Sequence, residues 1–159
     1  MSVELLRIDD RLIHGQVVEG WIPHLNADAV VIASAQAAAD ETQKTLMRMA
    51  LPDAVELHVL APADAAALLA SAALSAKRTL VLVPSPREAR ELVEAGLKVA
   101  SLNVGGLHYS AGRIQLGRVI YLSDEDRKDL RELVQRGIVL EGRAVPSDRR
   151  LDLASLIAA

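Results

Sequence analysis

Hydrophobic residues recur along the chain in short, evenly spaced runs that predict alternating strands and helices. Continuous apolar runs predict buried strands at 3–8, 29–33, 55–60, 79–83 and 98–102. Apolar residues at helical spacing predict helices between them, at 15–25, 37–50, 62–75 and 86–95. Regular alternation of this kind favours a parallel sheet with helices on both faces.

The C-terminal part of the chain predicts shorter elements in a less regular order. A glycine-rich loop at 103–107 is followed by short β segments at 114–116 and 119–122, and Ser123 then suits the N-cap of a helix that ends at Gly137. A last strand at 138–145 leads to a short helical tail from about residue 149. We therefore predict one domain over 1–159, an α/β three-layer fold with a mainly parallel central sheet and mixed strands near the C-terminus.

Composition narrows the classes of function. Aromatic residues make up only 2% of the chain and the net charge is −3, so neither stacking platforms nor a basic field indicates nucleic acid as a partner. The chain has no cysteine, which excludes disulfide and thiolate chemistry and is compatible with a reducing cytoplasm. The sequence shows no signal segment and no apolar run long enough to span a bilayer, so we expect a cytoplasmic protein.

The stretch 7–16 carries the densest chemistry in the chain. It reads R-I-D-D-R-L-I-H-G-Q and lies where the first predicted strand gives way to the first helix. His14 is therefore expected near a helix N-terminus, whose unpaired N–H groups favour an anion. Arg11 adds a planar cation that matches phosphate geometry, and the His14 imidazole is a nucleophile near neutral pH. Together these residues predict a histidine that accepts a phosphoryl group.

The neighbours of His14 allow more than one role. Asp9 or Asp10 can orient the imidazole or Arg11, and together with Arg7 these carboxylates can also pair among themselves and hold the loop in shape. Gln16, after Gly15, can cap the helix or face a bound sugar. The residues alone do not choose between these roles.

Other candidate residues follow later strands. In a parallel sheet, ligands bind beyond the carboxyl ends of the strands, which places Ser85, Gly105, Gly106 and His108 on the same rim as His14. The glycine pair lacks the spacing of a nucleotide-binding loop, so a turn with positive φ or a close backbone approach explains it better. Ser85, between two prolines, suits a turn. No histidine spacing indicates a metal site.

The stretch 7–16 closely resembles the N-terminal motif of the IIB components of the mannose/fructose/sorbose family of bacterial sugar phosphotransferase systems. Similarity continues through 40–52, 85–106, 113–126 and 137–148, and so covers nearly the whole chain. The resemblance implies that His14 carries the phosphoryl group, through Nδ1, and that Arg11 contacts it. The sequence departs from the family pattern after the second strand, where it has Ser34-Ala35-Gln36 and many family members have a pair of polar or acidic residues.

The resemblance also implies partners. A phosphorylated IIA protein or domain would donate the phosphoryl group to His14, and a IIC/IID membrane transporter would present the sugar, a hexose or related compound, at the inner face of the membrane. The intermediate is a covalent phosphohistidine, and no metal or other cofactor is expected because the donor is already activated. A homo-oligomer is possible.

Two functions other than sugar phosphotransfer stay open at this point. The chain is either the phosphotransferase of a sugar-uptake system or a regulatory phosphoprotein that IIA phosphorylates without any role in transport. A ligand-binding α/β domain without phosphotransfer is the third hypothesis, and it predicts that His14→Ala leaves activity intact.

Overall fold

A parallel sheet forms the centre of the computed structural model, which describes residues 3–108, 112–117 and 120–158. In these residues the sheet has seven strands in the order β3-β2-β4-β1-β5-β8-β9, and only the β8–β9 pair is antiparallel. The strands are β1 (Val3–Asp9), β2 (Ala29–Ala33), β3 (Glu56–Leu60), β4 (Thr79–Val83), β5 (Ser101–Gly106), β8 (Val139–Gly142) and β9 (Leu151–Asp152). A separate antiparallel hairpin joins β6 (Ile114–Gly117) to β7 (Ile120–Leu122).

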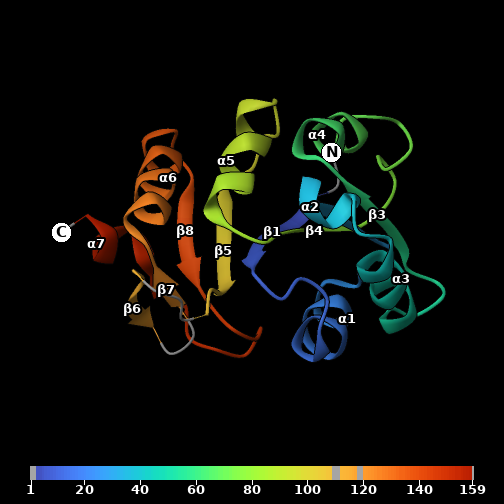
Figure 1. Cartoon of the computed structure of the whole chain (residues 1–159), viewed down its shortest axis with the longest axis horizontal. Coiled ribbons are helices and arrows are strands. Elements are labelled where there is room, and N and C mark those ends of the chain that lie inside the picture. The colour runs from blue at the N-terminus through green and yellow to red at the C-terminus, as the bar shows by residue number, and fades with distance from the viewer. Residues whose placement is uncertain (1–2, 109–111, 118–119, 159) are drawn as a thin grey trace.

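Helices cover both faces of this sheet and give the molecule three layers (Figure 1). The helical segments are the π-helix η1 (Val17–Trp21), α1 (Ile22–Leu25), α2 (Ala35–Ala38), α3 (Glu41–Ala50), α4 (Pro62–Leu69), α5 (Pro86–Glu94), α6 (Asp124–Gln135) and α7 (Leu153–Ile157). In Figure 1, α4, α5 and α6 lie on one side of the sheet, and α1 and α3 lie on the other. Among the described residues, no helix is both long and apolar enough to cross a membrane.

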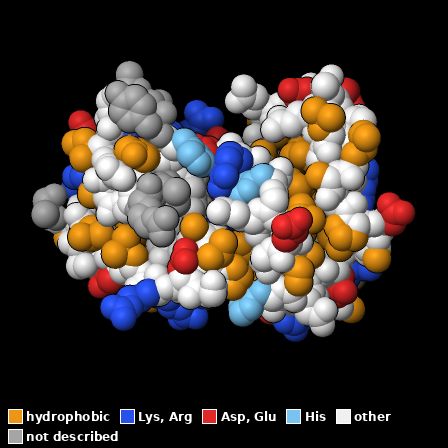
Figure 2. All heavy atoms as spheres, turned by 90° about the horizontal axis from the view of Figure 1, so that it is seen from below, with side chains coloured by type: hydrophobic (Ala, Val, Ile, Leu, Met, Phe, Trp, Pro, Cys, Tyr) orange, Lys and Arg blue, Asp and Glu red, His pale blue; other side chains and the backbone are white. Residues whose placement is uncertain are grey.

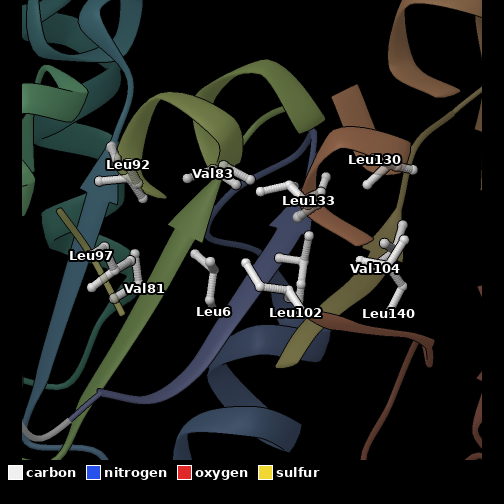
Figure 3. Packing of buried hydrophobic residues seen from close by; sticks show 14 of the residues in the cluster. Leu6, Val81, Val83, Leu92, Leu97, Leu102, Val104, Leu130, Leu133 and Leu140 are labelled. Atoms are coloured by element: carbon white, nitrogen blue, oxygen red, sulfur yellow. The ribbon is translucent and has the colours of Figure 1, made fainter. Parts of the chain in front are cut away.

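The alternation of side chains along the central strands explains the two covered faces. Val81 and Val83 of β4 belong to one buried cluster, whereas Leu80 and Leu82 belong to the other. The cluster beneath α5 and α6 is built from leucine and valine side chains of helices and strands (Figure 3). With no phenylalanine in the chain, aliphatic side chains fill this core.

The predicted fold class is confirmed, while several predicted boundaries are wrong. The predicted helix 37–50 is two helices, because Asp40 accepts a hydrogen bond from the backbone N–H of Gln43 and starts α3 afresh. The predicted strand 98–102 begins later, and the predicted loop 103–107 is mostly part of β5. The predicted strand 138–145 ends at Gly142, and residue 119 of the predicted segment 119–122 lies outside the described residues.

Strand β1 occupies the middle of the sheet, between β4 and β5. Its carboxyl end therefore meets the ends of both neighbours, and Ile8 is paired with Val83 of β4 and Val104 of β5. The chain leaves β1 through a turn in which the backbone N–H of Leu12 donates to the carbonyl of Asp9 (3.0 Å). This turn carries the predicted phosphoryl-accepting motif.

Candidate active site

The turn after β1 folds back on itself around a buried leucine. Leu12 has a φ of +58°, a left-handed conformation that is uncommon for a residue other than glycine, and its side chain is buried in the core cluster next to η1. The helical segment then begins at once, since the carbonyl of His14 accepts from the N–H groups of Val17 and Val18, both at 3.0 Å. Burial of Leu12 thus turns Arg11 and His14 back over the end of β1.

Asp9 contacts most of the other charged residues of this site. Its carboxylate is fully buried, and Oδ2 accepts hydrogen bonds from Nη2 of Arg7 (3.0 Å) and Nε2 of His14 (2.8 Å). The other oxygen, Oδ1, accepts from the backbone N–H of Arg11 (3.1 Å) and lies 3.5 Å from its Nε. One carboxylate therefore holds the histidine, the loop and both arginines in place.

The contact with Asp9 decides which nitrogen of His14 is available. A carboxylate only accepts hydrogen bonds, so Nε2 of His14 must carry the proton and Nδ1 keeps its lone pair in the neutral ring. The His14 side chain is 15% exposed. Among the described residues no hydrogen bond to Nδ1 is found, so this nitrogen is the one available as a nucleophile.

Arg11 supplies positive charge on the open side of the loop. Its side chain is 39% exposed, and Nη2 donates to Oε1 of Gln16 (3.1 Å). Gln16 is the N-cap residue of η1, but its side chain makes no capping hydrogen bond and contacts Arg11 instead. Histidine and basic side chains lie together near the notch on the face seen in Figure 2.

Arg7 lies in a buried polar layer beneath the site. It is fully buried, and Nη1 donates to Oδ1 of Asn103 (2.7 Å) and to the carbonyl of Arg143 (2.9 Å). Its guanidinium lies 5.0 Å from the centre of the Trp21 ring, and the guanidinium of Arg143 lies at the same distance from that ring. Asn103, Arg143 and Trp21 are not among the predicted site residues, and Asn103 falls in the segment 103–107 that the sequence predicts as a loop.

The charges around Asp9 determine its titration. Burial alone would raise the pKa of Asp9, but the hydrogen bond from His14 and the positive charge of Arg7 outweigh burial and hold this pKa below the usual value of a carboxyl group. Asp9 is therefore an anion near neutral pH, as its role as an acceptor for His14 requires.

A folded-state pKa below the unfolded value makes stability depend on acidity. Asp9 stabilises the fold above its unfolded pKa of about 4, and this contribution disappears as the pH falls through the lower folded pKa. We expect the free energy of unfolding to fall below pH about 4, and to fall less steeply in Asp9→Asn, which has no carboxylate to protonate. Urea unfolding of both proteins across this range measures the difference. An equally steep fall of the free energy of unfolding with pH in both proteins would contradict it.

Gly105 and Gly106 lie in β5 directly against the charged pair. A β-carbon on Gly105 would lie 1.9 Å from Cζ of Arg7, and one on Gly106 would lie 3.3 Å from Oδ1 of Asp9. Neither glycine is among those with positive φ. Of the explanations considered for the pair, the close backbone approach is confirmed and the turn is wrong.

We expect Gly105→Ala to destabilise the protein by about 2–4 kcal/mol, because the new methyl group must displace a buried, hydrogen-bonded guanidinium. Gly15→Ala is the matched control, since a β-carbon there has no atom within 4 Å and alanine is the better helix former by up to about 1 kcal/mol. Urea unfolding compares the two. Equal stability of both variants would contradict this account of Gly105.

The two remaining rim candidates have different surroundings. Ser85 is the N-cap residue of α5 and donates its hydroxyl hydrogen bond to Glu88, which indicates a structural role in starting the helix. His108 instead contacts Asp10, whose Oδ1 lies 2.6 Å from Nδ1 of His108. Asp10 therefore contacts His108, whereas Asp9 contacts both Arg11 and His14.

Comparison with known proteins gives the same family over the whole chain. The sequence pattern of the family described as PTS system sorbose subfamily IIB component matches residues 3–159. The mannose-specific EIIAB component of Escherichia coli K12 is 35% identical over 99% of this chain, which spans about half (49%) of that protein's length. The sorbose-specific EIIB component of Lacticaseibacillus casei is 33% identical, with 99% of this chain and 96% of that protein covered.

A solved structure agrees with the sequence comparison. The IIBSor domain of the sorbose permease from Klebsiella pneumoniae superimposes with a TM-score of 0.93 at 32% identity, covering 99% of this chain and 97% of that one. Both the fold and the sequence therefore point to one family.

Proposed function

Since the chain belongs to the sorbose-subfamily IIB components of the phosphotransferase system, we propose that it accepts a phosphoryl group on Nδ1 of His14 and passes it to a sugar during uptake. The donor is a phosphorylated IIA protein or domain, and the acceptor is a sugar held by a IIC/IID membrane transporter. The chain acts as one unit over 1–159, in the cytoplasm and transiently at the inner face of the membrane. No metal or nucleotide takes part, because the phosphohistidine donor is already activated.

One observation carries this proposal. Asp9 accepts a hydrogen bond from Nε2–H of His14, which leaves Nδ1 as the lone-pair nitrogen, and the same carboxylate lies 3.5 Å from Nε of the partly exposed Arg11 side chain. In the transfer, Nδ1 attacks phosphorus in line, and Arg11 neutralises charge on the phosphoryl oxygens. The phosphorylated ring retains its Nε2 proton and becomes cationic, which the buried Asp9 carboxylate stabilises.

Arg7 and Asn103 contribute by positioning. They keep the Asp9 carboxylate in one orientation, so that the imidazole does not need to reorganise when the phosphoryl group arrives. Gln16 likewise positions Arg11, because its Oε1 accepts a hydrogen bond from Nη2 of that residue.

The test has two stages. The first incubates the protein with phosphorylated IIA and follows intact mass for an acid-labile gain of one phosphoryl group. The second adds membrane vesicles from the organism that carries this chain, with mannose, fructose and sorbose as probes, and measures sugar phosphate. Gain of the phosphoryl group followed by sugar phosphate supports the proposal, and no gain from a competent donor would overturn it.

The second stage also tests the other candidate function. A regulatory phosphoprotein would gain the phosphoryl group and yield no sugar phosphate. The Ser34-Ala35-Gln36 segment favours keeping this candidate, because Ser34 is buried as the N-cap of α2, where it accepts from the N–H of Ala37 (3.1 Å), and the segment presents no carboxylate.

A further inference from the structure

A second carboxylate–imidazole pair lies next to the His14 site. Asp10 accepts from the backbone N–H of His108 with Oδ2 (2.8 Å), and its Oδ1 lies 2.6 Å from Nδ1 of that ring. Arg113 contacts both members of the pair, because its Nη1 donates to the carbonyl of His108 (2.8 Å) and lies 3.7 Å from the Asp10 carboxylate. Asp126 of α6 lies 3.5 Å from Nε of Arg113. These contacts fix the ring of His108 by its Nδ1 edge.

The two imidazoles belong to one rim because their carboxylates are consecutive residues at the end of β1. Asp9 holds His14 and Asp10 holds His108. The pairs differ in the nitrogen they engage: Asp9 bonds Nε2 of His14, and Asp10 bonds Nδ1 of His108. The His108 side chain is 43% exposed, and among the described residues its Nε2 has no hydrogen-bond partner.

This arrangement is that of a general base. With Nδ1–H donated to a carboxylate, the neutral ring keeps a lone pair on Nε2, and the carboxylate stabilises the cation that forms when Nε2 takes a proton. Transfer of a phosphoryl group to a hydroxyl releases a proton, whereas transfer from one histidine to another does not. Asp9 is not available for this proton, because it is fully buried and already bonded to Arg7 and His14.

We propose that His108, oriented by Asp10, is the general base that takes the proton of the acceptor hydroxyl when the phosphoryl group leaves His14. This inference rests on the proposed function and adds a residue to its second step. The hydroxyl oxygen attacks phosphorus, the P–N bond to Nδ1 of His14 breaks, and its electron pair returns to the ring. The hydroxyl proton passes to Nε2 of His108 and then to solvent, so the products are a phosphate ester and neutral His14.

The test separates the two half-reactions. His108→Gln is expected to accept the phosphoryl group from phosphorylated IIA at the wild-type rate, but to transfer it to sugar roughly 100-fold more slowly, the contribution of a positioned base. The second half-reaction uses the vesicles and the three sugars named above. His24→Gln, a histidine of α1 outside both carboxylate pairs, is the matched control and is expected to behave as wild type in both steps.

A pH profile distinguishes a base from a structural residue. A general base acts only in its deprotonated form, so the wild-type rate of sugar phosphorylation should rise with pH, and His108→Gln should lose this rise. Among the described residues, the charged groups that contact His108 are Asp10 and Arg113, and Asp126 lies 3.5 Å from Arg113, so Asp10→Asn should lower the same half-reaction and alter the same profile.

Three results would overturn the inference. One is a His108→Gln variant, folded by circular dichroism, that transfers to sugar at the wild-type rate. Another is equal slowing of both half-reactions, which indicates a structural role. A wild-type protein that takes no phosphoryl group overturns the proposed function first, and this inference with it.

Discussion

Replacing His14 with glutamine is expected to abolish phosphoryl acceptance. Glutamine has an amide nitrogen that can still donate to Asp9, but it has no lone-pair nitrogen to attack phosphorus. The fold should survive, because the side chain of His14 is partly exposed and the turn is held by Leu12 and the backbone bond to Asp9. Intact mass after incubation with phosphorylated IIA should therefore show no acid-labile gain.

The control for this experiment is His24→Gln. His24 lies in the last turn of α1 and its ring lies 6.0 Å from that of Trp21, so the same substitution there removes an imidazole without touching the carboxylate of Asp9. It should gain one phosphoryl group at the wild-type rate. A phosphorylated His14→Gln protein would assign the acceptor to another residue.

Replacing Asp9 with asparagine should slow phosphorylation by roughly 10²–10⁴-fold. The substitution removes the negative charge that stabilises the phosphorylated imidazolium and no longer requires Nε2 of His14 to carry the proton. It also leaves Arg7, which is fully buried, without its carboxylate partner. The rate of mass gain under excess donor measures this loss.

Asp40→Asn provides the comparison for the loss of one carboxylate. Asp40 caps α3 by accepting from the N–H of Gln43, and asparagine caps helices about as well. This variant should be phosphorylated at the wild-type rate. If Asp9→Asn is equally fast and folded, the carboxylate does not set the reactivity of His14.

Much of the site was predictable because it is contiguous in sequence. The stretch from Arg7 to Gln16 places a buried strand, a charged turn and a helix start in order, so the presence of Arg11 and His14 in one turn follows from local geometry. The choice between Asp9 and Asp10 did not follow, because it depends on which carboxylate points into the sheet. Asp9 is fully buried as the last residue of β1, whereas Asp10 lies just beyond it.

Two of the residues absent from the predicted site, Asn103 and Arg143, lie far along the chain. Asn103 lies in β5 and Arg143 follows β8, and their contacts with Arg7 span 96 and 136 residues. Such contacts require the order of strands in the sheet, which local periodicity does not determine. The role of Gly105 cannot be predicted from the sequence for the same reason, since only the pairing of β5 with β1 brings Gly105 against the Arg7 guanidinium.

A predicted helix boundary is wrong where a side chain bonds to the backbone and starts a new helix. Apolar spacing over 37–50 continues through Asp40, and the pattern cannot show that this carboxylate caps a new helix. The predicted strand ends before Gly105 and Gly106 because glycines are typical of loops, yet both lie within β5, where Gly106 pairs with Asp9 and the register shifts at Gly105. Their missing side chains make room for Arg7 and Asp9.

The most direct test of the account is to identify the phosphorylated atom. The protein, labelled with ¹⁵N in its histidines, is phosphorylated by IIA and examined by ³¹P and ¹⁵N NMR, in which the coupling between phosphorus and nitrogen identifies the bonded atom. We expect one phosphohistidine, at position 14, with phosphorus on Nδ1 and a proton on Nε2. Phosphorus on Nε2 of His14, or on another residue, would contradict the role assigned to Asp9.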